Sequence, residues 1–486
     1  MSETALGTAV GNLARVAPHR AALTCGTDTV SRDALEARTN RLARAYRELG
    51  VAPDSFVTIG LPNGIEFFEA VLAVWKLGAT PQPISSRLPA AERRAIIDLA
   101  NPSLVVGVEP SETPGRTTIP DGFEPAASLS SEPLPPLIGA SFKAPTSGGS
   151  TGRPKLIVAT QPATWESLEG FANLLKIPPD GVHLVTGPLY HNGPFVTSLL
   201  ALLRGNHLVI MERFDATGAL ALTERHRVEW MYAVPTMMHR IWRLPERERF
   251  DVSSLRVVFH MAAPCPTWLK QAWIDWLGGE RILELYGGTE AQAITFITGD
   301  EWLTHRGSVG RVILGEMVVL DASGNELPPG AVGEIWMRRG PDAPPSYRYI
   351  GARPKTRPGN WESFGDMGWK DTDGYVYLSD RDTDMILVGG ANVYPAEIES
   401  ALDEHPTVTS SCVIGLPDEE YGNVVHAIVQ ASGPLTPAEL EEFLRAKLTK
   451  YKRPRTYEFV SEPLRGDDGK VRRSALRAQR LADARR

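Results

Sequence analysis

The apolar positions of the chain fall into short runs that are rich in β-branched residues. Four of these runs are residues 56–61 (FVTIGL), 103–108 (SLVVGV), 207–211 (HLVIM) and 255–262 (LRVVFHMA). Short, continuous apolar runs bounded by polar or turn residues are typical of buried strands. The four runs therefore predict strands in the interior of the protein.

Between such runs the apolar positions recur with the period of a helix. In the segment of residues 33–50, Leu35, Leu42, Tyr46 and Leu49 lie on one predicted helical face, and Gly50 ends the helix. Strands that alternate with helices over this length predict an α/β protein built from layers.

Toward the C-terminus the pattern changes to that of a smaller unit. Its clearest helix begins with Thr436 as the N-cap, Pro437 at the first helical position and Glu439 closing a capping box. A chain of 486 residues is too long for one compact core. We therefore predict two domains, residues 1–382 and residues 383–486.

Composition and charge narrow the class of protein. The content of 42% hydrophobic and 22% charged residues is that of a folded globular protein, and the formal net charge of -7 argues against nucleic acid as the main partner. Cys25, Cys265 and Cys412 lie far apart in the sequence and indicate neither a disulfide framework nor a zinc site. The N-terminal residues do not resemble a signal peptide and no run approaches the roughly 18 apolar residues of a membrane span, which predicts a cytoplasmic protein.

The segment TSGGSTGRPKL, residues 146–156, has the composition of a phosphate-binding loop. Its glycines let the backbone approach a ligand, and Ser147, Ser150 and Thr151 supply hydroxyl groups. By itself the segment is also typical of a surface loop. A Walker loop is excluded, because a proline precedes Lys155 and no serine or threonine follows it.

Three more segments follow this loop in a set order: YGGTE at residues 286–290, FGDMGWKDTDG and its continuation at 364–399, and GDDGKVRRSALR at 466–477. With residues 61–85 near the front, the ordered set closely resembles the adenylate-forming superfamily of acyl-CoA synthetases, adenylation domains and luciferases. The resemblance covers nearly the whole chain. It implies an α/β fold with a large N-terminal domain of layered subdomains and a small, mobile α+β C-terminal domain.

The resemblance implies a binding site for ATP. The corresponding residues are Ser147, Gly148, Gly149, Ser150, Thr151, Gly152, Lys155, Tyr286, Gly287, Gly288, Asp366 and Arg381. The loop with Lys155 would hold the β- and γ-phosphates, and Tyr286 would stack near the adenine. Thr289 would contact the α-phosphate, and Glu290 corresponds to the ligand of a magnesium ion, a hard cation that a carboxylate suits.

Other positions correspond to the ribose site and the catalytic lysine. Asp366 and Arg381 match the pair that binds the ribose hydroxyls, and Lys470 matches the lysine that neutralises charge during adenylation. With Thr289 and Glu290, Lys470 forms the implied catalytic set. The implied reaction joins a carboxylic acid to the α-phosphate of ATP and then transfers the acyl group to a thiol.

The small domain would rotate between these two steps. Asp382 and Thr383 correspond to the hinge, where Thr383 departs from the more usual Asp or Lys, and Gly389 with Gly390 corresponds to the loop that lines the path of the thiol. Phe364 is a second departure, because a threonine is more usual at this position. Coenzyme A is the expected thiol, since the chain lacks room for the long insertion that blocks thioester formation in fatty-acyl-AMP ligases.

The implied wall of the acyl pocket is small and apolar. Its residues are His191, Asn192, Gly193, Phe195, Ala262 and Ala263. Amino-acid-activating domains generally place an aspartate in the segment that corresponds to residues 187–205, and this chain has none there, so a buried substrate ammonium would lack a partner. The motifs look most like the bile-acid, steroid and fatty-acid CoA ligase branch, which implies an apolar carboxylic acid as the substrate.

Two alternatives from other classes stay open at this stage. One is a stand-alone adenylating enzyme that loads a carrier protein, and the basic run KYKRPR at residues 450–455 fits either a phosphate patch for CoA or a solvated surface. The other is an inactive homologue that only binds nucleotide or a partner protein, which the joint presence of the motif residues disfavours. The sequence is compatible with a homodimer and does not fix the oligomeric state.

Overall fold

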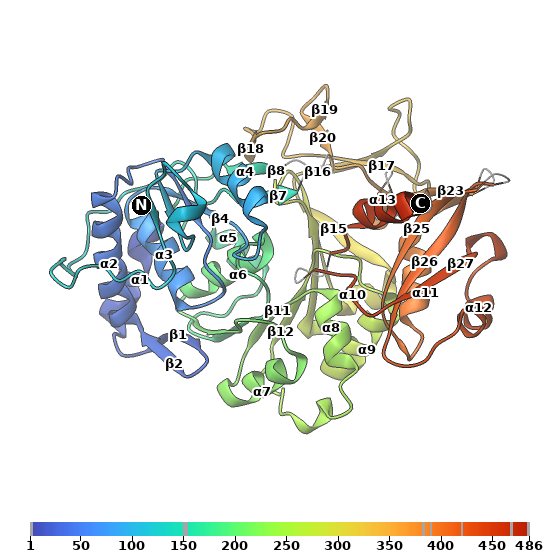
Figure 1. Cartoon of the computed structure of the whole chain (residues 1–486), viewed down its shortest axis with the longest axis horizontal. Helices are drawn as coiled ribbons and strands as arrows, with labels where there is room; N and C mark the ends of the chain where they lie inside the picture. The colour runs from blue at the N-terminus through green and yellow to red at the C-terminus, as the bar shows by residue number, and fades with distance from the viewer. Residues whose placement is uncertain are drawn as a thin grey trace.

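The computed structural model describes residues 3–148, 154–381, 384–388, 391–418, 421–466 and 470–483. In Figure 1 the elements up to β22 (Tyr375–Arg381) run from blue through yellow to pale orange, and the elements after residue 384 form the darker orange and red part at the right. No helix in the described ranges combines the length and the apolar character that crossing a membrane requires.

One long mixed sheet forms the centre of the N-terminal part. Its parallel region has the order β1 (Ala21–Cys25), β10 (His207–Ile210), β9 (Val182–Val185), β11 (Trp230–Ala233), β12 (Val257–His260) and β13 (Ile282–Gly287). Every residue of β11 and β12 is buried, as expected for parallel strands covered on both faces. The predicted runs at 207–211 and 255–262 are therefore confirmed as strands in this core.

The same sheet continues beyond β13 with antiparallel strands. They are β14 (Ile294–Thr298), β15 (Ser308–Leu314), β22, β21 (Asp366–Lys370), β17 (Gly333–Arg338), β20 (Trp361–Ser363) and β19 (Lys355–Arg357), with β16 (Glu316–Leu320) paired to β17 and β2 (Asp28–Ser31) paired to β1 at the opposite edge. The change from parallel to antiparallel pairing occurs at β13, where the YGGTE motif begins. The loop that follows β13 thus lies where the parallel and the antiparallel parts of the sheet join.

Two smaller sheets complete the N-terminal part. The parallel sheet of β4 (Thr80–Pro83), β3 (Phe56–Ile59), β5 (Leu104–Val106) and β6 (Thr118–Ile119) confirms the predicted strands at 56–61 and 103–108. The antiparallel sheet of β18 (Tyr347–Ile350), β8 (Pro154–Ala159) and β7 (Thr146–Gly148) carries the ends of the predicted phosphate loop.

The helices of the N-terminal part pack on these sheets. They are α1 (Leu6–Val16), α2 (Arg32–Glu48), α3 (Ile65–Lys76), α4 (Ala90–Ala100), α5 (Glu169–Leu174), α6 (Asn192–Leu203), α7 (Ala216–His226), α8 (Pro235–Trp242), α9 (Thr267–Leu277) and α10 (Gly299–Thr304). The predicted helix at 33–50 is α2. Ser31 caps its N-terminus, Leu35 and Tyr46 are buried, and Gly50 follows its end with a φ of 98°, in the left-handed region that favours glycine.

The residues after 384 form a separate layer of strands and helices. Its elements are β23 (Ile386–Val388), β24 (Ala391–Val393), α11 (Pro395–Asp403), β25 (Val408–Asp418), β26 (Gly422–Ala431), α12 (Pro437–Arg445), β27 (Thr456–Val460) and α13 (Arg473–Asp483). Strands β25, β26 and β27 share one sheet, and a core that includes Ile398, Val413 and Leu444 lies against it. The predicted capping box of Thr436 and Glu439 is present in α12. The domain boundary at residues 382 and 383 stays a prediction, because these two residues lie outside the described ranges.

Arginines of the C-terminal helix α13 bind residues of the small domain, although no residue of this helix is fully buried. Arg473 of α13 binds the carboxylates of Asp384 and Glu399, with N–O distances of 2.7 Å to each. Arg480 binds the carboxylate of Glu458 at 2.7 Å, and Arg477 donates to the carbonyl of Gly415 at 2.8 Å. The arginines therefore attach α13 to the small domain.

Candidate active site

The predicted phosphate loop connects two paired strands. Ser147 of β7 lies opposite Lys155 of β8, and Gly148 lies opposite Pro154. Gly149, Ser150, Thr151 and Gly152 lie outside the described residues. The pairing fixes the two ends of the loop, so that Ser147 and Lys155 lie on the same face of the small sheet.

Lys155 belongs to a compact cluster with Tyr349 and Glu290. Its Nζ donates to the hydroxyl oxygen of Tyr349 at 2.8 Å and lies 3.4 Å from Oε1 of Glu290. The Tyr349 hydroxyl donates to the same Oε1 atom at 2.5 Å. The Glu290 side chain is only 7% exposed, so that this carboxylate and its two donors interact in a region of low polarity.

Tyr349 is a site residue that the sequence analysis missed. It lies on β18 opposite Ile157 of β8, and this register places its ring over Lys155, with Nζ 4.0 Å from the ring centroid. Burial, together with the negative charge of Glu290, raises the pKa of Tyr349 well above its usual value. The hydroxyl therefore keeps its proton and acts as the donor toward Glu290.

The YGGTE motif forms the turn after β13. The N–H of Ala291 donates to the carbonyl of Gly288 at 3.0 Å and closes the turn, and the hydroxyl of Ser346 donates to the backbone carbonyl of Glu290 at 2.6 Å. Thr289, which lies between Gly288 and Glu290 in the sequence, is half-buried. The turn thus directs the Glu290 side chain inward.

Gly288 is required by its contact with Phe364. A Cβ atom at position 288 would overlap the Phe364 ring and would lie 2.9 Å from Oε2 of Glu290. At Gly287, which ends β13, a Cβ atom would lie 3.1 Å from the carbonyl oxygen of Ala293. Phe364, one of the departures from the usual motif, therefore covers the glycine turn.

The predicted adenine and ribose positions are adjacent. The hydroxyl of Tyr286 donates to Oδ2 of Asp366 at 2.8 Å. Asp366 on β21 lies directly opposite Arg381 on β22, whose backbone position is described. Three residues that are far apart in the sequence thus meet beside the YGGTE turn, as the motif assignment predicts, and their roles toward a nucleotide stay predictions.

The N-terminus of α6 carries the first four predicted pocket residues. His191 is the N-cap and contacts the ring of Tyr190, and Asn192 is the first helical residue. A Cβ atom on Gly193 would lie 2.8 Å from the hydroxyl oxygen of Tyr232, so that the helix approaches this buried tyrosine closely. Phe195 is fully buried and packs edge-on against Phe67 with ring centroids 6.2 Å apart.

Lys143 is the second residue near the site, after Tyr349, that the sequence analysis missed. Lys143 is only 6% exposed, and its Nζ donates to Oδ1 of Asn192. Burial lowers the pKa of Lys143 to about 7, while the negative charge of Glu290 raises it. The only signal in the sequence is a lone lysine three residues before the phosphate-loop segment.

Ala262 and Ala263 lie in the loop after β12. Ala262 is exposed and has a φ of 77°, a conformation that residues with a side chain rarely adopt, and Ala263 is half-buried. His260, the last residue of β12, is fully buried, with Nδ1 3.9 Å from the carboxylate of Glu284. The two alanines stay predicted pocket residues.

Of the five site residues predicted near the hinge and in the C-terminal domain, only Lys470 lies in the described ranges. Lys470 is exposed in a turn where the N–H of Gly466 donates to its carbonyl at 3.0 Å, just before α13. Asp382, Thr383, Gly389 and Gly390 lie outside the described residues. The roles of these five residues in the catalytic, hinge and thiol sites therefore stay predictions.

The basic run at residues 450–455 is largely neutralised within the small domain. Lys452 binds Glu397 at 2.7 Å, Arg453 binds Glu441 at 2.6 Å, and Arg455 lies 3.5 Å from Asp418. These pairs favour the solvated, ion-paired surface over a phosphate patch.

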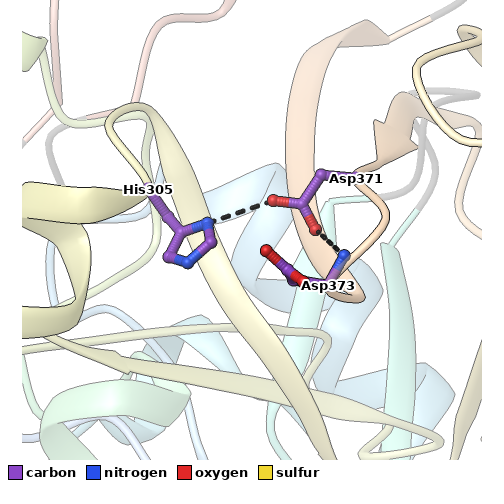
Figure 2. Close-up of side chains that lie close together, drawn as sticks. All are labelled: His305, Asp371 and Asp373. Carbon is purple, nitrogen blue, oxygen red and sulfur yellow. Dashed lines mark hydrogen bonds and ion pairs between the residues drawn. The ribbon is translucent and has the colours of Figure 1, made fainter.

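His305, Asp371 and Asp373 lie together at the turn between β21 and β22 (Figure 2). This group lies away from the cluster that contains Lys155. Oδ2 of Asp371 lies 3.1 Å from Nδ1 of His305, and Oδ1 accepts the N–H groups of Asp373 at 3.0 Å and Tyr375 at 2.8 Å. The His305 ring stacks on Tyr375 with centroids 3.5 Å apart. These bonds hold the turn together, which explains the cluster without a metal ion.

Comparison with protein families agrees with this geometry. Residues 12–347 match the model of the AMP-binding enzyme family, and residues 397–467 match that of the AMP-binding enzyme C-terminal domain. The chain belongs to the AMP-binding enzyme family, which confirms the predicted superfamily.

Curated relatives and solved structures match over nearly the full length. Feruloyl-CoA synthase from Amycolatopsis sp is 32% identical over 98% of this chain and 99% of its own, and the long-chain-fatty-acid–CoA ligase FadD13 from Mycobacterium tuberculosis is 29% identical over 92% of each. The structure of o-succinylbenzoate CoA synthetase (MenE) from Bacillus subtilis with its acyl-adenylate intermediate has a TM-score of 0.83 at 25% identity, covering 98% of each chain. The same enzyme with ATP and magnesium has a TM-score of 0.79 at 25% identity, covering 96% of this chain and 99% of that one. The predicted fold, a large N-terminal and a small C-terminal domain, is confirmed.

Proposed function

We propose that this chain is an ATP-dependent acid–thiol ligase of the AMP-forming acyl-CoA synthetase type. A carboxylate oxygen of the substrate attacks the α-phosphorus of ATP, and the bond to the β-phosphate oxygen breaks, which yields acyl-AMP and pyrophosphate. The thiol of coenzyme A then attacks the acyl carbon and displaces AMP, leaving the thioester. The full-length relatives include feruloyl-CoA synthase, the CoA ligase FadD13 and o-succinylbenzoate CoA synthetase, which supports the acyl-CoA ligase predicted from the motifs.

The observation that carries the proposal is the cluster of Lys155, Tyr349 and Glu290 beside the pair of Tyr286 and Asp366. A lysine at the end of a glycine and hydroxyl loop supplies positive charge for phosphate oxygens. A carboxylate such as that of Asp366 accepts hydrogen bonds from ribose hydroxyl groups. We assign Lys155 to the phosphate end of ATP and Asp366 with Arg381 to the ribose.

The donor set also suits magnesium. Glu290 offers a hard carboxylate, and a magnesium ion needs one or two protein carboxylates when the phosphates of the nucleotide supply further oxygens. Hydrogen bonds from Lys155 and Tyr349 hold this carboxylate through Oε1. When bound, the ion would supply positive charge to the phosphate oxygens. A related synthetase has been solved with ATP and magnesium, and another relative is named a CoA synthase, which supports ATP, magnesium and CoA as the ligands of this chain.

The residues near α6 favour an apolar acid without an amino group. The first turn of α6 has no acidic side chain, and the buried Lys143 lies beside it. A substrate ammonium would meet positive charge here and no counter-charge. We therefore propose an aryl, fatty or steroid-like carboxylic acid, in line with the feruloyl and long-chain fatty acyl groups in the relatives' names.

The test is AMP release by the purified protein with ATP and a panel of aryl, fatty and steroid carboxylic acids, with and without CoA. We expect AMP and acyl-CoA in equal amounts for one class of acid. Lys470→Ala should lower the adenylation rate on the order of 10² to 10³-fold, as expected for the loss of an electrostatic stabiliser. Lys176→Ala, at an exposed position after α5, is the matched control and should keep the full rate.

Two other results would contradict the proposal. Pyrophosphate release without transfer to CoA would point to an adenylating enzyme with a carrier protein as its acceptor. Nucleotide binding without turnover of any acid would indicate an inactive homologue.

A further inference from the structure

Lys143 is a buried lysine that donates a hydrogen bond to a neutral amide. Its Nζ donates to Oδ1 of Asn192, and the residue is 6% exposed. No carboxylate oxygen from the described part of the chain lies within 4.0 Å of this nitrogen. It is costly to bury an ammonium without a counter-charge in contact with it. Burial therefore lowers the pKa of Lys143 to about 7. Among the described residues the ammonium therefore has no carboxylate in direct contact, and Glu290 acts on it only from a greater distance.

The amide partner belongs to the positive end of a helix. Asn192 is the first residue of α6, a helix of 12 residues, and its first turn contains no acidic side chain. The first N–H groups of a helix have no partner within the helix, and the helix dipole adds positive potential there. The ammonium and the helix end would repel each other, whereas a bound anion would stabilise both.

Lys143 also lies on the same sheet face as Lys155. The N–H of Ala159 donates to the carbonyl of Lys143 at 3.1 Å, which extends the pairing of Ser147 with Lys155 along the two strands. Residues an even number of positions apart on a strand point to the same face, and four residues span about 13 Å. The anion site at Lys143 thus lies on the active-site face, four residue pairs away from Ser147 and Lys155 and next to α6.

We propose that the Lys143 ammonium, together with the first turn of α6, binds the carboxylate of the acid substrate. This inference rests on the proposed function, because that reaction brings an acid carboxylate next to the nucleotide. The phosphates are assigned to Lys155 at the opposite end of the face, so the carboxylate is the anion left for Lys143. The residue would position the attacking carboxylate and would compensate its charge in an apolar pocket.

The experiment measures binding without turnover. The wild type is saturated with α,β-methylene-ATP, which cannot form an adenylate, and titrated with cinnamate and with decanoate by calorimetry. Lys143→Met removes the charge and keeps the stem, and Lys143→Gln keeps a donor for Asn192. We expect both variants to bind the acids about tenfold more weakly or worse, since each removes the charged donor of the proposed hydrogen bond to the carboxylate. Affinity for the nucleotide analogue should stay within about threefold, and Lys176→Gln should match the wild type.

A second readout separates a charge contact from a structural role. The uncharged amide cinnamamide should bind the wild type about tenfold more weakly than cinnamate does, and Lys143→Met should lose this preference. A loss in Lys143→Met with normal binding in Lys143→Gln would overturn the role of charge. Weaker nucleotide binding with unchanged acid binding would also overturn the proposal, because it would place the ammonium on a phosphate.

The two proposals can fail separately. If the wild type binds acids with this preference for the carboxylate but releases no AMP, the proposed function fails and the role of Lys143 stands. If Lys143→Met forms acyl-CoA with an unchanged KM for the acid, the role of Lys143 fails and the proposed function stands.

Discussion

Arg243, at the end of α8, donates from its Nη2 atom to the carbonyl oxygen of His405 at 2.9 Å and thereby links the two parts of the chain. The same guanidinium donates to the carbonyls of Asp403, at 3.1 Å, and Pro406. These carbonyls lie at the C-terminal end of α11, where a helix has unpaired oxygens and a negative potential. Arg243 thus holds the small domain through the end of one helix.

Arg243→Ala should loosen this contact. Hydrogen exchange of the backbone amides at residues 403–408 should become about tenfold faster, which corresponds to a loss of about 1.4 kcal/mol of local stability. Arg445→Ala, which removes an exposed arginine paired with Glu442 within α12, is the control and should leave these amides unchanged. Equal exchange in wild type and Arg243→Ala would show that the contact contributes nothing in solution.

Tyr349→Phe should weaken the binding of MgATP. The substitution removes the hydroxyl that receives a hydrogen bond from Lys155 and donates one to Glu290. Because each of these bonds involves a charged group, we expect the KM for MgATP to rise about tenfold or more. Tyr377→Phe removes a hydroxyl that binds Asp371 instead, and it should change the KM for MgATP by less than about threefold. Similar effects of both variants would argue against a specific role of Tyr349.

Asp366→Ala should remove selectivity for the ribose. The carboxylate accepts the Tyr286 hydroxyl at 2.8 Å and is proposed to bind ribose hydroxyls as well. The wild type should use ATP better than 2′-deoxy- or 3′-deoxy-ATP by about tenfold in kcat/KM, and Asp366→Ala should use all three equally poorly. If the variant keeps the discrimination, another residue reads the ribose.

The buried Lys143 should make stability depend on pH. Its pKa is lowered from 10.5 to about 7 on folding, so that the unfolded chain binds more protons between these two values. Stability should therefore rise with pH from about 7 toward 10, by up to about 1.4 kcal/mol per pH unit. Urea unfolding of the protein without ligands, at pH 7.0 to 9.5, should show this rise relative to Lys143→Met. Parallel pH profiles of the two proteins would contradict the lowered pKa of the buried Lys143 amine.

Asp371→Asn should destabilise the turn between β21 and β22. Burial acts to raise the pKa of Asp371, but hydrogen bonds from Tyr375, Tyr377 and His305 outweigh it and lower the pKa. The stabilisation is therefore present above the unfolded value of about 3.9 and is lost as pH falls through the lower folded value. The melting temperature of Asp371→Asn should lie below that of the wild type at pH 7, and the gap should narrow toward pH 3.5. Asp373→Asn is the control, since the bond from residue 373 to Asp371 comes from its backbone.

The sequence predicted what depends on local patterns. The strands within residues 207–211 and 255–262 are present because short apolar runs are stable only in the interior, and the capping box of Thr436 and Glu439 depends on residues three apart. Helix α12 ends at Arg445, and Leu448, three residues further on, is buried beyond the helix end.

The sequence could not predict contacts between distant segments. Tyr349 reaches Glu290 across 59 residues, and Lys143 reaches Asn192 across 49. Both contacts depend on the register of β18 with β8 and on the position where α6 begins, which no local pattern encodes. The motif positions around Glu290 and Asp366 were found because their order along the chain resembles a known family.

The contact of Gly288 with Phe364 restricts how this site can evolve. A larger residue at position 288 would collide with the aromatic ring, so a lineage would need to replace Phe364 by a smaller residue first. If Gly288 were replaced first, the resulting protein would have a displaced turn and a displaced Glu290. A library that varies either position alone would therefore miss combinations that are functional only as pairs, and the two positions should be randomised together.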